Sequence, residues 1–243
     1  MVDQPPAGRR ARLRAEVTTQ ILAAARGHLA TEGPDGLSLR AIARDLGMGV
    51  SSLYRYFPSR DDLLTELLID AFNDQADAVA AAVDGLDDPA QALRDGVRAY
   101  RAWSLSHPPE FALAYGTPVP GFQAPAERTV QAGVRVGGIL IDLISGAWDR
   151  DLIDRSRVAT RDANLTADER AGLDALASRR GYAIPAGLMS LTVDLFVRVH
   201  GFVVMESFGQ LRPMVADPTA TFERTIDECL DELGLLYWQG VDR

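Results

Sequence analysis

The chain has 243 residues, of which 47% are apolar, a composition typical of globular proteins and not of disordered ones. No apolar run reaches the roughly 18 residues that span a bilayer, and the N-terminus lacks the apolar core of a secretion signal, so we expect a cytoplasmic protein with no membrane role. The single cysteine, Cys229, excludes an internal disulfide and a thiolate metal cluster.

The net charge of −9 is unevenly distributed along the chain. Residues 1–60 hold nine arginines and five acids, a net +4, so the remaining residues carry −13. Such a division concentrates the attraction for phosphate at one end of the molecule and repels nucleic acid from the rest.

Apolar residues recur at helical period along nearly the whole chain, and no strict alternation indicates a sheet, so the sequence predicts an all-α fold. The first helix is predicted from Arg14 to about Glu32, where the breaker cluster 33–36 ends it. Residues 1–13 form a basic arm, which either follows the minor groove or the phosphates of DNA or is a disordered, solvated tail. The arginines concerned are Arg9, Arg10, Arg12 and Arg14.

Residues 39–57 show the pattern of a helix-turn-helix, in which a first helix lies across the DNA backbone and a second enters the major groove. Ser38 is placed to cap the first of these helices, and Gly47 supplies the tight turn. The second is predicted over 50–57 and stops at a proline. We therefore assign 14–60 to a DNA-binding domain and 61–243 to a larger helical domain.

The larger domain opens with a long helix, capped by Ser59 with Asp62 three residues on. The stretch 150–165 is charged and reads as a loop. Helices are predicted in chain order over 89–106, from 108, over 125–148, from 166 to about 181, over 185–211 and over 217–237.

The sequence resembles the TetR family of bacterial transcriptional regulators. The resemblance is carried by Ile42-Ala43, Leu46-Gly47, the run Leu53-Tyr54-Arg55-Tyr56-Phe57 and the run 59–64, SRDDLL. It implies that the N-terminal domain binds double-stranded DNA. Three positions depart from the usual pattern, because Gly49 removes a helix cap, Ser51 adds a hydroxyl near the bases and Arg60 replaces a lysine.

The resemblance implies a role for each residue of the reading surface. Tyr54, Tyr56 and Arg60 are candidates for phosphate contacts, and Ser38 offers its hydroxyl to another phosphate. The candidates for base contacts are Arg40, Val50, Ser51 and Ser52, with Arg55 also facing solvent or DNA. Tyr54 and Val50 have an alternative reading as core residues, and Arg55 as a solvated surface charge.

The larger domain resembles a TetR subclass with a His-Gly pair, here His200-Gly201, in the penultimate long helix. The resemblance implies a homodimer joined through the last two helices, and hence a near-palindromic operator. Apolar residues lie around most of the predicted helix over 188–208, as expected for a helix in such an interface. A helix buried at the centre of one monomer would show the same pattern.

We expect a small apolar or aromatic ligand between the helices of this domain. The residues proposed to line its site are Trp103, Phe111, Tyr115, Trp148, Met189, Phe196 and His200, although each is also an ordinary core residue by type. The function predicted is a repressor released by that ligand, with a transcriptional activator or a protein-binding adaptor as alternatives.

The sequence gives no support to an enzyme. Its three histidines, His28, His107 and His200, have no metal-ligand spacing, and no nucleophile elbow, phosphate loop or dinucleotide fingerprint is present. We therefore predict no catalytic residues, no metal and no cofactor.

Overall fold

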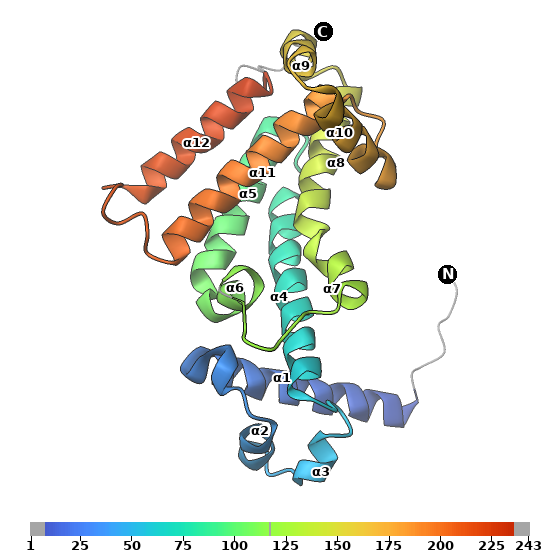
Figure 1. Cartoon of the computed structure of the whole chain (residues 1–243), viewed down its shortest axis with the longest axis vertical. Coiled ribbons are helices and arrows are strands. Elements are labelled where there is room, and N and C mark those ends of the chain that lie inside the picture. Colours follow the sequence, from blue (N-terminus) through green and yellow to red (C-terminus); the bar gives the residue numbers. More distant parts are fainter. Residues whose placement is uncertain (1–7, 117, 236–243) are drawn as a thin grey trace. The chain divides into compact units, whose positions relative to one another are not determined.

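The computed structural model describes residues 8–116 and 118–235, except for the side chains of residues 9 and 10. These described residues form twelve α-helices and no strand (Figure 1). The predicted all-α class is therefore confirmed. The chain divides into two compact units, the first made of 1–74 with 107–133 and the second of 75–106 with 134–243.

This division differs from the predicted boundary after residue 60. The first unit includes α6 (Pro108–Tyr115) and α7 (Ala126–Gly133), which lie far from its other helices in sequence. Their connecting loop adds Val119 to the same apolar cluster as the helix-turn-helix, and Arg128 of α7 donates hydrogen bonds to Asp62 and Glu66 of α4 (Arg60–Val83). These contacts join residues that are far apart in the sequence, and the periodicity of apolar residues does not reveal such contacts.

Helix α1 (Arg9–Gly36) begins five residues before the predicted start at Arg14. Part of the predicted arm is therefore helical, and its first seven residues lie outside the described part of the chain. The predicted break is present, because Gly33 adopts φ 70° and ψ 177° inside this element. A left-handed residue of this kind costs glycine little and interrupts the helix.

The caps predicted for α2 (Leu39–Asp45) and α4 are both formed. Ser38 Oγ accepts a hydrogen bond from the Ala41 amide at 3.4 Å, and Ser59 Oγ accepts one from the Asp62 amide at 3.0 Å. Each bond satisfies one of the amide groups that a helix leaves without a partner in its first turn.

In the second unit, α11 (Ala186–Ser207) contacts five other helices. They are α5 (Pro89–Ser106), α8 (Arg135–Asp149), α9 (Arg155–Ala163), α10 (Ala167–Arg179) and α12 (Pro218–Glu232), with α12 running beside α11 in Figure 1. The capping box predicted at Thr166 and Glu169 begins α10. By length and composition α11 could also cross a membrane, although the core helix of a globular domain passes the same test.

The helix predicted over 125–148 is wrong as a single element, because it breaks between Gly133 and Arg135 into α7 and α8. Gly133 is approached closely by the ring of Phe72, so that an added Cβ would lie 3.3 Å from it. The segment also contains Gly137, Gly138 and Gly146, which lie inside α8 without breaking it, so glycine alone does not predict where the helix breaks.

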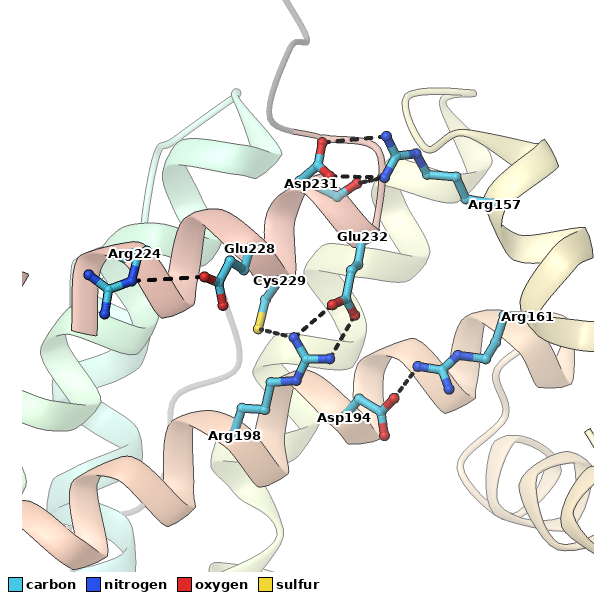
Figure 2. Close-up of polar contacts among 9 residues, drawn as sticks. All are labelled: Arg157, Arg161, Asp194, Arg198, Arg224, Glu228, Cys229, Asp231 and Glu232. Atoms are coloured by element: carbon cyan, nitrogen blue, oxygen red, sulfur yellow. Dashed lines mark hydrogen bonds and ion pairs between the residues drawn. The ribbon is translucent and has the colours of Figure 1, made fainter. Parts of the chain in front are cut away.

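The loop predicted over 150–165 is also wrong, because it contains α9. Asp154 caps this helix by accepting a hydrogen bond from the Ser156 amide, and Val158 is buried. Two of its arginines bind acids outside the segment, since Arg157 pairs with Asp231 of α12 and Arg161 with Asp194 of α11 (Figure 2). Part of the charge that suggested a loop therefore makes tertiary contacts.

The last helix ends at Glu232, earlier than the predicted end at 237. Gly234 follows with φ 74°, and an added Cβ there would lie 2.5 Å from Cβ of Asp154. The predicted apolar face holds as far as it is described, with Phe222, Ile226 and Cys229 buried. Tyr237 lies outside the described residues.

Candidate DNA-binding site

The turn between α2 and α3 (Val50–Leu53) depends on Gly47, whose φ is 62°. Its amide donates to the Arg44 carbonyl at 3.0 Å, and the Met48 amide reaches back to the Ala43 carbonyl at 2.8 Å. This left-handed C-terminal motif satisfies carbonyls at the end of α2 and turns the chain sharply. The next helix can then leave at the steep angle that a helix-turn-helix requires.

Helix α3 is shorter than the predicted 50–57, because residues after Leu53 continue as turns. Its N-cap, Gly49, forms no side-chain hydrogen bond, as the sequence predicted. Leu53 and Phe57 are 0% and 4% exposed and anchor this segment in the core of the unit. Packing by these two side chains, not capping, therefore holds residues 50–57, here called the reading segment, in place.

The predicted reading residues lie on the outer side of this segment. Val50 and Tyr54 are 39% and 41% exposed, so neither is a core residue. Ser51 and Arg55 are also exposed, and Arg55 donates a hydrogen bond to Ser52 Oγ at 3.1 Å. The structure therefore brings an apolar side chain, hydroxyls and a guanidinium together on one short surface, the combination that base edges and phosphates bind.

The two tyrosines differ in their surroundings. Tyr54 presents its ring to solvent, whereas Tyr56 is half-buried and packs against the apolar cluster of the unit. The guanidinium of Arg14 lies over the Tyr56 ring, 5.4 Å from its centroid. Helix α1 is thereby placed next to the end of the reading segment.

Arg40 is exposed at the start of α2, in keeping with its predicted base contact. Arg60, in contrast, donates a hydrogen bond to the Pro34 carbonyl at 2.6 Å and lies 3.8 Å from Asp35. It therefore links the start of α4 to the end of α1, and a phosphate contact would have to share its remaining N–H groups.

His28 is a positioning residue that the sequence did not single out. Its Nε2 lies 2.7 Å from Asp45 Oδ2, and its side chain is only 13% exposed. The contact joins the middle of α1 to the last residue of α2. A lone histidine on an amphipathic helix gives no sign of this partner, because Asp45 belongs to another helix.

A row of acids on α4 was also missed. Arg26 of α1 lies 3.1 Å from both Asp70 and Asp74, while Arg128 of α7 binds Asp62 and Glu66. Residues four apart share one face of a helix, so arginines from two other helices hold the same side of α4. Burial raises the pKa of Asp70, against the opposing effect of Arg26.

The predicted ligand-site residues are divided between the two units. In the first unit, the ring of Tyr115 lies 5.0 Å from that of Phe111 and 5.8 Å from that of Phe72. Phe111 is fully buried. These contacts form an aromatic cluster within α4 and α6.

In the second unit, Phe196 and His200 stack with their ring centroids 5.5 Å apart, and His200 Nδ1 lies 2.7 Å from the Tyr100 hydroxyl. Burial lowers the pKa of His200. Phe196 and Tyr100 also line an apolar cavity with only about 10 Å³ of space for the centre of a water molecule. This is roughly one water and no more.

The other predicted ligand-site residues of this unit lie elsewhere. Met189 is fully buried and Trp103 is 6% exposed, while the Trp148 ring lies 4.1 Å from the guanidinium of Arg155. Trp148 is therefore occupied by a cation–π contact. Within the described residues, no group of three His, Cys, Asp or Glu side chains is placed to hold a metal ion.

The short helix α2, the left-handed glycine turn and the exposed segment 50–57 define a helix-turn-helix DNA-binding protein. Residues 21–67 match the family model described as "Bacterial regulatory proteins, tetR family", and residues 93–229 match the one described as "Tetracyclin repressor-like, C-terminal domain". The chain belongs to the TetR family of transcriptional regulators.

Relatives support this assignment over most of the chain. The HTH-type transcriptional regulator Rv1816 of Mycobacterium tuberculosis is 38% identical over 226 residues, covering 89% of this chain and 92% of the relative. A crystal structure of the regulatory protein SCO4313 is 31% identical, with a TM-score of 0.73, covering 91% of this chain and 98% of that one. The repressor DrrR1 of Streptomyces coeruleorubidus matches only locally, at 43% over 54 residues, or 22% of this chain and 20% of that protein.

Proposed function

We propose that this DNA-binding regulator is a homodimeric repressor that leaves a near-palindromic operator when a small apolar or aromatic ligand binds. The observation that carries the proposal is the exposed surface of Val50, Ser51, Tyr54 and Arg55, held on the buried anchor Leu53. Because its partner is DNA, we place the protein in the cytoplasm. Repression needs only that the bound protein occludes a promoter.

An exposed face of α11 supports the homodimer. Val193 and Val197 are 36% and 59% exposed, and Gly201 follows them with no atom within 4 Å of an added Cβ. Positions three or four apart share one helix face, so these residues form one stripe on which a second copy can pack closely. Two-fold symmetry would then place the two α3 helices about 34–36 Å apart in successive major grooves.

The pairing of Tyr100 with His200 beside the small apolar cavity supports a ligand site in the second unit. The walls of the cavity are apolar, and the paired Tyr100 phenol and His200 imidazole supply a few polar groups. Small-molecule sites commonly combine apolar walls with a few polar groups. The cavity is too small for a ligand in this conformation, so binding would favour a more open one. The ligand shifts the equilibrium only by its differential affinity for the two conformations.

Helix α4 is the route by which such a shift would reach the reading segment. It is continuous from Arg60 to Val83, and its residues belong to the first unit up to Asp74 and to the second from Gln75. Arg26 and Arg128 hold its acidic side within the first unit. A displacement of α4 would therefore strain contacts to α1 and α7.

Selection from genomic DNA tests this function. Purified protein is mixed with sheared DNA from its source at about 50 and about 200 mM salt, and the bound fragments are sequenced. We expect one near-palindromic motif that weakens with salt and is lost in the Tyr54→Ala/Arg40→Ala variant. Absence of a motif from a folded wild-type dimer would favour a protein-binding adaptor.

The ligand step is tested separately, by screening small aromatic and apolar compounds against the selected operator. Compounds that raise the melting temperature of the protein are the ones to examine. Release of operator DNA by such a compound is the expected result. A compound that stabilises the protein and leaves operator affinity unchanged would contradict the proposed switch.

A further inference from the structure

An imidazole lies between two carboxylates where α1 meets α2. Nε2 of His28 is 2.7 Å from Oδ2 of Asp45, and its Nδ1 is 3.4 Å from Oε1 of Glu32. The His28 side chain is 13% exposed, whereas those of Glu32 and Asp45 are 50% and 47% exposed. His28 and Glu32 belong to α1, and Asp45 ends α2. The imidazole therefore faces one acid of its own helix and one acid of the next.

The number of donors that this site needs identifies the form of the imidazole. An ionised carboxylate only accepts hydrogen bonds, and a neutral imidazole has one N–H donor and one acceptor nitrogen. When Nε2 of neutral His28 donates to Asp45, its Nδ1 presents a lone pair to the carboxylate of Glu32. Nδ1 is buried and makes no hydrogen bond within the described part of the chain. An imidazolium has a donor on both nitrogens, so only the protonated form can bind both acids.

The other surroundings of His28 do not replace these two acids. Besides His28 and Asp45, an open cleft beside the imidazole is lined by groups that do not titrate, namely Ala24, Gly27 and Thr31. Arg44 lies 3.6 Å from Oδ1 of Asp45, the oxygen that His28 does not contact, and its side chain is 79% exposed. The charged groups that act on the imidazole are therefore Glu32 and Asp45, and the cleft lets it exchange protons with water.

Asp45 connects this site to the reading segment. It lies two residues before the left-handed Gly47, and α3 begins at Val50. We propose that His28 is a positioning residue for operator recognition, which in its protonated form holds the end of α2 against α1. This inference rests on the proposed function and adds a dependence on pH. As pH rises, the imidazole loses its second donor, the contact weakens and operator affinity falls.

The Kd for the selected operator, measured by fluorescence anisotropy at constant ionic strength from about pH 6 to about pH 8, tests the inference. One hydrogen bond of ordinary net strength corresponds to about 2- to 13-fold in an equilibrium constant. Because a dimer holds two copies of His28, the wild-type Kd should rise at least about fivefold toward pH 8. His28→Gln can donate to Asp45 at every pH and should lack this rise.

The matched control is His107→Gln, which removes an exposed histidine of the same unit and should keep the wild-type pH dependence. Equal melting temperatures would show that the variants are folded. Parallel pH curves for wild type and His28→Gln would overturn the inference.

A second variant separates the bridge from the general attraction of a positive charge for DNA. Glu32→Gln keeps the contact of His28 with Asp45 and provides an amide, which can accept from a protonated Nδ1 or donate to a neutral one. Its Kd should therefore change little with pH, because both forms of the imidazole are satisfied. If Glu32→Gln keeps the full wild-type rise, charge alone acts and the bridge is refuted. This variant also decides the matter if His28→Gln does not fold.

A measurement without DNA distinguishes failure of this inference from failure of the proposed function. NMR signals of the His28 imidazole report its protonation, and the amide signals of Asp45, Leu46 and Gly47 report the end of α2. We expect these amides to titrate together with the imidazole in the wild type and not in His28→Gln. Amides that stay constant while His28 titrates would overturn the inference even with an operator in hand. If no motif is selected from genomic DNA, the proposed function fails, whether or not the amides titrate.

Discussion

Arginines are used differently in the reading surface and in the second unit. Arg40 is exposed and forms no ion pair within the described part of the chain, and Arg55 donates to the hydroxyl of Ser52 at 3.1 Å. In the second unit arginines are held by acids of other helices, such as Arg98 by Glu223, Arg101 by Glu206 and Arg198 by Glu232. Figure 2 shows Arg157, Arg161 and Arg198 paired in this way.

This difference shows which arginines stabilise the fold and which attract DNA. A paired arginine contributes to packing and geometry but adds little to the long-range potential, because its partner cancels the charge. An arginine without an acidic partner retains its attraction for phosphate. Within residues 1–60, Arg26 is paired with Asp70 and Asp74, so Arg40 and Arg55 contribute more to the attraction for DNA than Arg26 does.

The largest effect is expected from breaking the most buried of these pairs. Arg101 donates to both carboxylate oxygens of Glu206 at 2.7 and 2.6 Å, and the two side chains are only 16% and 13% exposed. Arg101→Met leaves this carboxylate without its partner, so the free energy of unfolding should fall by about 3–5 kcal/mol. Urea unfolding at fixed protein concentration measures it.

Two further variants make this test specific. Arg224→Met breaks an exposed pair with Glu228, whose side chains are 64% and 60% exposed, and should change stability by less than about 0.5 kcal/mol. Arg101→Met/Glu206→Leu removes both charges and should recover much of the loss. Equal losses for Arg101→Met and Arg224→Met would show that burial does not distinguish the pairs.

The reading surface should show the opposite behaviour. Arg40→Ala should weaken binding to the selected operator by about 1–3 kcal/mol, or roughly 5- to 150-fold, because a guanidinium contact to a base edge or phosphate is lost. The free energy of unfolding should not change, since the side chain is exposed. Arg170→Ala, which breaks a pair with Asp162, should leave operator affinity at its wild-type value.

Local signals explain why the helix-turn-helix was predictable. A serine cap, a left-handed glycine and apolar residues at helical spacing each act within a few residues, so Ser38, Gly47 and Leu53 predict their own environments. The same holds for the capping box at Thr166.

Contacts between distant segments could not be predicted in this way. The stretch 150–165 is predicted as a loop because its charges are visible in the sequence, whereas the distant partners of Arg157 and Arg161, Asp231 and Asp194, are not. The ligand-site residues were chosen by type, and type does not reveal that the Trp148 ring lies under Arg155 or that Phe111 belongs to the first unit. Arg60 suggested a phosphate contact, although its hydrogen bond is to Pro34.

A smaller effect concerns the pH dependence of stability and comes from His200 of the second unit. Burial lowers the pKa of His200 below its ordinary value of 6.5, so the unfolded chain takes up this proton before the folded one does. Stability is therefore fully present above about pH 6.5 and falls as pH decreases through the folded-state pKa. Unfolding of wild type and His200→Gln by urea, at several pH values from about 7.5 to 5, measures the difference.

The variant should lose less stability than wild type over that range. His28 and His107 remain in both proteins, so their contributions cancel in the comparison. Parallel pH curves for the two proteins would mean that His200 takes up its proton equally well in the folded and unfolded chains.

The smallest effect is expected at the start of α3, where Gly49 provides no side-chain cap. Gly49→Ser would supply an oxygen for an amide of the first turn, and a serine cap exceeds glycine by only a few tenths of a kcal/mol. The φ of −65° suits serine, and no atom lies within 4 Å of the new Cβ, so no strain offsets the gain. Thermal unfolding should show a slight rise, and slower amide exchange over 50–53 would locate it. A loss of stability would contradict this expectation, because it would mean that the serine hydroxyl disturbs the packing of Leu53 and Phe57 that holds the segment in place.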